Sequence, residues 1–272
     1  MEKVTLKVFR GDVMGGELVT YEVPTQPGMV VLDAIHYIQK NIDGSLAARW
    51  NCKAAKCGSC SAEVNGKPRL MCKSRVDEYP EGVITVTPMR AFPLLKDLVT
   101  DVSWNYRVSA KIPPLVPKPE VAGKPFRMQQ EDVDRVQEFR KCIECFLCQD
   151  VCHVLREHDR KDGFFGPRQM VKLAALEMHP MDNLNRREQL KNEAGIGFCN
   201  ITKCCTEVCP EHIHITDNAI IPLKERVADD YFDPVQGLLR RVGLIKREKK
   251  QPMDSVPNEQ TRIHTESLQR AK

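Results

Sequence analysis

The stretch that decides the fold of the N-terminal half is Cys52-Lys53-Ala54-Ala55-Lys56-Cys57-Gly58-Ser59-Cys60, and a fourth cysteine, Cys72, follows it. This C-x4-C-x2-C spacing with a distant fourth cysteine is the plant-type pattern that holds a [2Fe–2S] cluster. Two irons need four thiolates, so the close trio has to wrap the cluster in one tight loop. We expect Gly58 to let backbone amides approach the sulfides. The alternative is a four-cysteine zinc site, although zinc favours paired C-x2-C units.

Short segments with strand-like alternation surround this loop. The expected strands are residues 4–9, 18–23, 61–64, 68–72 and, last, 83–87. Three glycines between residues 11 and 16 predict a turn, and apolar residues at helical spacing predict a helix over 30–42 that stops near Gly44. Asn65-Gly66 is a strong hairpin signal because such a turn needs positive φ. The pattern predicts a small mixed sheet with one helix.

Eight more cysteines form two groups in the C-terminal half: Cys142, Cys145, Cys148 and Cys152, then Cys199, Cys204, Cys205 and Cys209. The first group matches the bacterial ferredoxin run, in which the fourth cysteine ligates the other cluster. The second group keeps the same period if Thr202 occupies the place of the second cysteine. Crossing the fourth ligands assigns a [4Fe–4S] cluster to Cys142, Cys145, Cys148 and Cys209. It assigns the other cluster to Cys152, Cys199 and Cys205.

Three thiolates at this last site predict a [3Fe–4S] cluster. Cys204 is then left over, as a buried thiol that binds no iron. Because Cys204 lies one residue from a ligand position, its service as a fourth ligand is the open alternative. Zinc or spare thiols are the alternative for both groups.

Composition limits the classes of protein that fit. A length of 272 residues predicts roughly two domains, and 12 cysteines would suggest disulfides only in a secreted chain. The N-terminus shows no apolar secretory segment, and no uncharged stretch reaches the roughly 18 residues of a membrane-spanning helix. The formal charge of +4 falls to about −2 if three clusters each contribute about −2. We therefore expect an intracellular chain that binds no nucleic acid.

The remaining segments complete an α+β fold. Residues 92–98 predict a short helix, five prolines mark 112–125 as a semi-extended linker, and Asp132 is expected to cap a helix that runs toward Cys142. Further helices are expected over 167–179, over 185–194 and from Thr216, the last kinked by Pro222. The predicted domains are a plant-type ferredoxin β-grasp domain (1–105), a proline-rich linker (106–130), an all-helical bacterial-ferredoxin-like domain (131–244) and a polar tail (245–272).

These motifs resemble the iron–sulfur subunit of succinate dehydrogenase and fumarate reductase. The resemblance spans about residues 1–230. It rests on Cys57-Gly58-Ser59-Cys60, Asn65-Gly66, Leu70 with Cys72, Phe92-Pro93-Leu94-Leu95-Lys96-Asp97-Leu98, Cys142-Ile143 with Cys145, and Cys209-Pro210. Many quinone-linked members carry Pro and Trp after the equivalent of Cys152 and His after that of Cys199. Here His153 and Asn200 stand there, so the family's quinone-contacting residues are not transferred.

The resemblance implies an oxidoreductase subunit that carries electrons and no catalytic residue of its own. It implies [2Fe–2S], [4Fe–4S] and [3Fe–4S] clusters in a line between a flavoprotein subunit that contains FAD and a membrane-anchor subunit that handles quinone. The chain would then lie peripherally on the cytoplasmic face of the cell membrane. Succinate dehydrogenase is the main hypothesis. The alternatives are fumarate reductase working in reverse, a subunit of another flavoenzyme and, remotely, a zinc-binding interaction protein.

A basic run follows the last cysteine group at some distance. It comprises Arg240, Arg241, Lys246, Arg247, Lys249 and Lys250. Such a run is typical of a surface that meets anionic lipid headgroups, where each charge contributes about 1 kcal/mol. It is equally typical of a solvated tail. Both interpretations stay open at this point.

Overall fold

A computed structural model of the chain describes residues 3–121, 124–125, 127–245 and 250–252. The chain divides into two compact units, each built from separate segments. The first, here called the sheet unit, comprises Met1–Val102, Cys142–Asp159 and Cys204–Ile213. The second, the helical unit, comprises Ser103–Lys141, Arg160–Lys203 and His214–Lys272. The domain boundaries expected at residues 105, 130 and 244 stay predictions.

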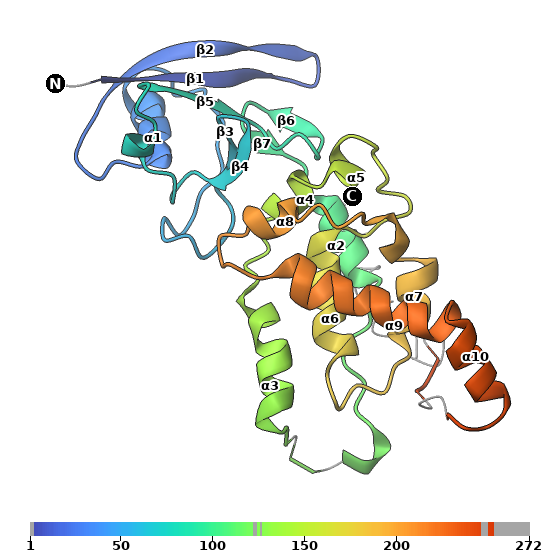
Figure 1. Ribbon diagram of the computed structural model, residues 1–272. Coiled ribbons are helices and arrows are strands. Elements are labelled where there is room, and N and C mark those ends of the chain that lie inside the picture. Colours follow the sequence, from blue (N-terminus) through green and yellow to red (C-terminus); the bar gives the residue numbers. More distant parts are fainter. Residues whose placement is uncertain (1–2, 122–123, 126, 246–249, 253–272) are drawn as a thin grey trace, which may run out of the picture. The chain divides into compact units, whose positions relative to one another are not determined.

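The sheet unit contains a mixed sheet and one long helix (Figure 1). Its strands are β1 Lys3–Asp12, β2 Gly15–Pro24, β3 Ser61–Val64, β4 Lys67–Leu70, β5 Val83–Thr87, β6 Leu94–Lys96 and β7 Val99–Thr100. The order is β4-β3-β5-β1-β6-β7, with β2 also paired to β1. Strands β1 and β5 run parallel, and the other pairs are antiparallel. The five predicted strands are confirmed, and the sheet continues beyond the expected last one.

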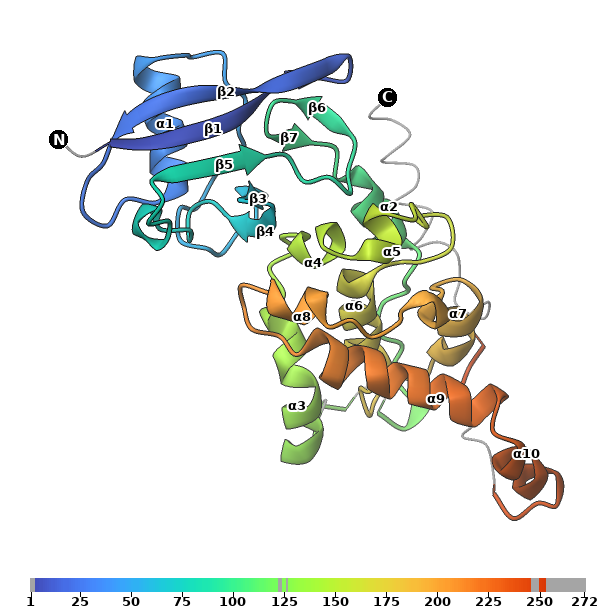
Figure 2. The ribbon, with the colours of Figure 1, turned by 45° about the horizontal axis from the view of Figure 1, so that its top comes forward.

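Alternating apolar residues build the core of this sheet. Along β1, Val4, Leu6 and Val8 are buried. Helix α1, Val31–Asn41, buries one apolar face and crosses the sheet (Figure 2). Each fully buried aliphatic side chain contributes about 1.5–3 kcal/mol to folding. The predicted helix is therefore confirmed, and it ends before Gly44.

The predicted turn between residues 11 and 16 is confirmed, and it is shorter than expected. Strand β1 continues to Asp12 and β2 begins at Gly15, so the turn comprises residues 13 and 14. A Cβ on Gly11 would lie 2.3 Å from the carbonyl oxygen of Gly15. The flanking glycines therefore also let the two paired strands approach each other closely.

The prediction of a helix over residues 92–98 is wrong, because this segment forms β6 and then turns into β7. Asp97 stands in the turn with φ +50°. Its buried carboxylate accepts hydrogen bonds from the backbone N–H of Gly11 at 3.0 Å and of Ala47 at 2.8 Å, and from Nε of Arg10 at 3.1 Å. Contacts with partners far along the chain select the hairpin over a local helix.

Three short helices in the sheet unit follow cysteines of the later groups. They are α4 Leu147–Asp150, α5 His153–Arg156 and α8 Cys204–Glu207. A short 3₁₀ segment, Val76–Glu78, precedes β5. The C-terminal cysteines therefore belong largely to the unit that also holds the first cysteine loop.

The helical unit packs around α6 and α9 (Figure 1). Its α-helices are α2 Ser103–Ala110, α3 Gln130–Gln137, α6 Pro167–Glu177, α7 Arg186–Asn192, α9 Ile221–Tyr231 and α10 Pro234–Arg241. Shorter 3₁₀ segments are Pro119–Val121, Glu138–Lys141 and Ile196–Phe198, and a π-helical segment, Ile215–Ile220, leads into α9. None of the helices in the described residues is long and apolar enough to span a bilayer.

One predicted detail of these helices needs correction. Gln129, not Asp132, is the N-cap of α3, so Asp132 lies in the first turn. Pro222 lies where the π-helical segment passes into α9, and the kink expected there stays a prediction. The helices predicted over 167–179 and 185–194 are confirmed. Most of the predicted tail lies outside the described residues.

One buried ion pair organises the proline-rich segment within the helical unit. The guanidinium of Arg186 contacts Asp182 at 2.6 Å, and both side chains are fully buried. Arg186 also donates to the carbonyl oxygens of Pro113 and Pro114 at 2.9 Å each. Prolines lack a backbone N–H and do not form a regular ladder, so this arginine fixes the path of the segment by donating to its carbonyl oxygens.

Candidate iron–sulfur sites

The first cysteine loop wraps around its own thiols. Lys53 and Ala55 adopt left-handed conformations, with φ of +55° and +54°. Left-handed residues that alternate with ordinary ones turn successive backbone N–H groups inward and create an anion-binding concavity. The Sγ of Cys52 accepts N–H groups from Ala54 and Lys56 at 3.3 Å each. The loop therefore offers the donors that an anionic cluster with its thiolates needs.

The other three cysteines of this group lie close together. Burial raises the pKa of Cys60 to about 12, and the nearby thiols of Cys72 and Cys57 add to the shift. Burial opposes ionisation of Cys57 as well, but hydrogen bonds with Ser59 and Cys52 lower its pKa to about 6. Cys72 stands in the turn after β4, not on a strand as expected. The N–H of Met71 bonds to the carbonyl oxygen of Cys60 at 3.1 Å and keeps that turn beside the loop.

The second group gathers with Cys209. Burial raises the pKa of Cys145 to about 12, with contributions from the neighbouring thiols of Cys142 and Cys209. Burial also raises the pKa of Cys148 well above its usual range, and Cys145, Cys142, Cys205 and Cys209 all add to that shift. The Sγ of Cys209 accepts the N–H of Ile213 at 3.4 Å. The four predicted ligands of the four-iron cluster therefore lie within electrostatic reach of one another.

The predicted ligands of the last cluster divide between the units. Cys152 and Cys205 are buried in the sheet unit, whereas Cys199 belongs to the helical unit. The ligand trio therefore stays a prediction. Cys204 is only half-buried, so the expectation of a buried thiol at this position is wrong.

The backbone repeats itself between the second and third cysteine groups. Glu144 and Phe146 are left-handed, with φ of +55° and +61°. Ile201 and Lys203 are left-handed at the same offsets from their leading cysteine, both with φ of +63°. Helix α4 begins directly after the first pair and α8 directly after the second. Thr202 therefore occupies the backbone place of Cys145, and Cys204 that of Leu147.

The two-iron loop packs directly on the four-iron loop within the sheet unit. Gly58 has φ +69°, and a Cβ there would lie 2.5 Å from the Cα of Cys145. The hydroxyl of Ser61 donates to the carbonyl oxygen of Cys145 at 2.9 Å. Gly58 is thus required by the close approach of two backbones, which differs from the reason expected from the sequence.

A group of charged side chains, in which the carboxylates are buried, lies beside this junction. The N–H of Ala91 donates to Oδ1 of Asp150 at 2.9 Å. Glu63 on β3 forms ion pairs with Arg90 at 3.1 Å and with Arg156 of α5 at 3.2 Å. Burial raises the pKa of Asp150 to about 7, and the adjacent Glu63 carboxylate adds to the shift. These contacts join the sheet to the segment that carries Cys142–Cys152.

The spacing of the cysteines identified the thiols but not this supporting structure. The left-handed residues Glu144, Phe146 and Ile201 are not glycines, so nothing in their identity signals positive φ. Ser61, Asp150 and Arg156 are ordinary polar residues whose roles depend on distant partners. Asp150 stands two residues after the predicted ligand Cys148. Of these residues, it alone has a position in the sequence that hints at a supporting role, and the hint is weak.

The donor set fits iron–sulfur clusters. Soft thiolates select such clusters. The buried thiols of Cys60, Cys145 and Cys148 ionise at neutral pH only if a cation compensates their charge. All twelve cysteines lie among the described residues, and none of them is in a disulfide. In that same part of the chain, no group of three or more histidine, cysteine, aspartate or glutamate side chains is arranged to hold a single metal ion.

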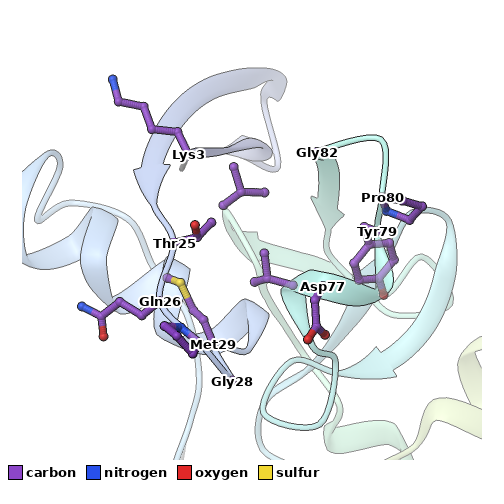
Figure 3. Close-up of a pocket in the computed structure, with 12 residues that line it drawn as sticks. Lys3, Thr25, Gln26, Gly28, Met29, Asp77, Tyr79, Pro80 and Gly82 are labelled. Atoms are coloured by element: carbon purple, nitrogen blue, oxygen red, sulfur yellow. The ribbon is translucent and has the colours of Figure 1, made fainter. Parts of the chain in front are cut away.

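The described part of the sheet unit has at least two hollows. One, of about 440 Å³, is bordered by Met29, Asp77 and Tyr79 and by none of the predicted ligands (Figure 3). The other, of about 470 Å³, is bordered by Cys209, Leu147 and Lys73. The second hollow therefore lies beside Cys209, a predicted four-iron ligand, whereas the first lies apart from the predicted ligands.

These features define an iron–sulfur protein that joins a plant-type ferredoxin module to a dicluster module. The 2Fe-2S iron-sulfur cluster binding domain family matches residues 5–106, and the 4Fe-4S dicluster domain family matches residues 138–213. The [2Fe–2S] and [4Fe–4S] clusters and the α+β fold class are thereby confirmed.

The chain belongs to the family of iron–sulfur subunits of succinate dehydrogenase and fumarate reductase, which are electron-transfer subunits of oxidoreductases. It is 32% identical to the fumarate reductase iron-sulfur subunit of Mycobacterium tuberculosis over 71% of this chain and 79% of that protein. It is 32% identical to the same subunit of Haemophilus influenzae over 79% of this chain and 88% of that protein. A chain of the Mycobacterium smegmatis Sdh1 complex in the apo form is 58% identical, with a TM-score of 0.83, over 86% of this chain and 98% of that chain.

Proposed function

We propose that this chain is the electron-transfer subunit of a succinate dehydrogenase that reduces quinone. In this proposal it passes electrons from FAD in a flavoprotein subunit toward quinone at a membrane-anchor subunit. The observation that carries the proposal is the 58% identity to a chain of the Sdh1 complex over nearly all of that chain. The fumarate reductase subunits of Mycobacterium tuberculosis and Haemophilus influenzae are each 32% identical.

The reverse direction is the second candidate. Several relatives are named fumarate reductase iron-sulfur subunits, which favours an enzyme that reduces fumarate with quinol. The chain itself holds the relay and not the succinate site in either case. Direction therefore depends on the potentials of the redox groups and not on a catalytic side chain here.

The third cluster is part of the proposal. We assign Cys152, Cys199 and Cys205 to a [3Fe–4S] cluster, supported by the repeat that places Thr202 where Cys145 stands. We assign Cys142, Cys145, Cys148 and Cys209 to the [4Fe–4S] cluster, supported by the mutual effect of their thiols. Cys52, Cys57, Cys60 and Cys72 are the proposed [2Fe–2S] ligands.

The chain's own residues hold and insulate these groups. The clusters supply one-electron transfer when bound, while the inward N–H groups beside Cys52 stabilise negative charge and influence the potential. Ser61 and Gly58 keep the loop of the two-iron cluster against that of the four-iron cluster. Tight packing between the two loops favours electron transfer because it keeps them close and excludes water.

The proposal is tested by purifying the chain with its native partners through an affinity tag. We expect a flavoprotein with FAD and a membrane-anchor subunit to copurify from the membrane fraction, with the chain on the cytoplasmic side. The complex should reduce a quinone analogue with succinate faster than it reduces fumarate with the quinol. Faster fumarate reduction would favour the second candidate. A fully soluble pool that is active without partner subunits would contradict both.

A further inference from the structure

The C-terminal helix α10 presents an apolar face that the rest of its unit leaves exposed. Both ribbon views show it at the end of α9, beyond the other helices of the helical unit (Figures 1 and 2). The exposed fractions of Val235, Leu238 and Val242 are 63%, 61% and 59%. These residues recur at helical spacing and therefore lie on one side of the helix. Phe232 and Leu244, at the two ends, are exposed to 67% and 74%.

Contacts on the opposite face of α10 hold this helix in place, so the orientation of its exposed face is fixed. Arg240 donates to the carboxylate of Asp230 on α9 at 2.9 Å and to Gln236 at 3.0 Å. Asp230 is also paired with Arg187 of α7 at 2.8 Å. The side chain of Asp233 caps the helix by accepting the N–H of Val235 at 2.8 Å. Helix α9, itself paired with α7, thus holds α10 with its apolar residues outward.

Charge distinguishes the partner that this face fits. From Pro234 to Arg247 the sequence carries four basic residues and no acidic one. Arg241 lies among the exposed apolar residues, and Lys191 of α7 lies over the rings of Tyr231 and Phe232, at 4.5 Å and 5.7 Å from their centroids. Large aliphatic and aromatic residues together with cations, in a capped amphipathic helix, are the composition that inserts into the headgroup layer of an anionic bilayer.

We propose that the face formed by Phe232, Val235, Leu238, Arg241, Val242 and Leu244 binds directly to anionic lipid at the membrane surface. The apolar side chains enter the boundary between headgroups and acyl chains, and Arg241 contacts lipid phosphate. This contact is a property of the chain itself and does not require the proposed direction of electron transfer. It would add to whatever attachment a membrane-anchor subunit provides.

The test uses the full-length chain with its clusters and vesicles of phosphatidylcholine with or without phosphatidylglycerol. We expect flotation with the anionic vesicles only, and weaker binding as salt is added. Leu238→Glu should weaken binding at least about tenfold, since it places a charge where an apolar side chain is buried. Arg241→Gln should weaken it by about fivefold, the value of one cation at an anionic surface.

The matched control is Leu18→Glu, which places the same charge at a leucine that is 47% exposed on β2. It should bind vesicles as the unaltered chain does. Val242→Glu repeats the test just beyond the last residue of the helix, where the substitution does not change helix propensity. Cluster absorbance reports that each variant is folded. Failure of the unaltered chain to bind anionic vesicles, or equal binding by Leu238→Glu, overturns the proposal. If Leu238→Glu instead releases a partner subunit while lipid binding is absent, the face binds protein and the proposal is wrong.

Discussion

At the scale of single residues, Gly58 is the position where the smallest change should matter most. Replacing it with alanine adds a Cβ 2.5 Å from the Cα of Cys145 and forces a left-handed φ on a residue with a side chain. We expect Gly58→Ala to lower the free energy of unfolding by about 2–4 kcal/mol, because backbone strain and a backbone clash add. Denaturant unfolding of the cluster-containing chain measures this.

The control for Gly58 is Gly28. Gly28 has a similar φ, +76°, but nothing lies within 4 Å of an added Cβ. Gly28→Ala should therefore cost only the backbone strain, about 1 kcal/mol. Equal losses in the two variants would show that the approach of the loops contributes nothing.

We expect Thr202 to determine the number of irons in the proposed last cluster. A hydroxyl is a much poorer iron ligand than a thiolate, and Thr202 stands at the backbone place that Cys145 occupies in the neighbouring group. We expect the oxidised protein to show the sharp, near-isotropic EPR signal of a three-iron cluster. Thr202→Cys should diminish that signal by converting the site to four irons.

Cys204 provides the contrasting variant. Its backbone place is that of Leu147, which is not a ligand in the crossed assignment. Cys204→Ser should therefore leave the three-iron signal intact. If the unaltered protein lacks the signal and Cys204→Ser creates it, Cys204 is the fourth ligand and the assignment fails.

At the scale of elements, the short helices α4 and α8 exchange ligands in the proposed crossed ligation. The thiol of Cys209, which follows α8, lies near Cys142, Cys145 and Cys148. Cys209→Ser should therefore abolish the reduced four-iron EPR signal and spare the two-iron signal. Cys152→Ser, at the other end of the pair, should damage the three-iron signal first. Loss of only the three-iron signal in Cys209→Ser would refute the crossed ligation.

Glu138 joins the 3₁₀ segment after α3 to the π-helical start of α9. Burial opposes ionisation of its carboxylate, but hydrogen bonds from the N–H and ring of His214 and from Asn218 outweigh it and lower the pKa. A carboxylate with a lowered folded-state pKa stabilises the fold above its unfolded pKa of about 4.3, and this contribution is lost as pH falls through the folded value.

Stability should therefore fall more steeply on acidification in the unaltered chain than in Glu138→Gln. Thermal unfolding from neutral pH down to about pH 3 measures the two slopes, because the loss occurs below the unfolded pKa of about 4.3. Acid damages the clusters equally in both chains, so the difference between the two slopes reports the Glu138 carboxylate. Parallel slopes would show that this carboxylate is not linked to folding.

Elements also show how far sequence alone reaches. Strands β1 and β5, helix α1 and the Asn65-Gly66 hairpin were predictable because period and turn chemistry are local. The segment around Asp97 was not, because its hairpin depends on N–H groups of Gly11 and Ala47, far along the chain. The candidate ligands followed from spacing, whereas the loops that hold them depend on left-handed residues that are not glycines.

At the scale of the whole molecule, the three segments of the sheet unit should respond differently to loss of iron. The sheet of β1–β5 has its own apolar core, whereas Cys142–Asp159 and Cys204–Ile213 contain only short helices around thiols. Burying several thiolates without a cation is costly, so removal of the clusters should loosen these two segments before the sheet. Hydrogen exchange of the apo and cluster-containing chains measures this. Equal protection in both would contradict it.

The division of the chain into two units also shows which features of the fold the sequence predicts and which it does not. Composition and cysteine spacing predict two modules in the order in which they occur. They do not predict that Cys142–Asp159 and Cys204–Ile213 pack with the N-terminal sheet, because that packing depends on Ser61, Glu63 and Ala91 meeting residues far along the chain. Contacts between residues so far apart in the chain leave no periodic pattern in the sequence.

The three-segment construction of the sheet unit bears on synthesis. A ribosome releases Met1–Val102 first, and this segment contains the complete two-iron loop and most of the sheet. Cys209 emerges only after the intervening helices have been made, roughly ten seconds later at typical elongation rates. The first cluster can thus be delivered to a nascent chain, whereas the proposed four-iron ligands come together only after roughly another hundred residues have been made. Delivery of iron and sulfide to this protein is then ordered in time by the path of its backbone.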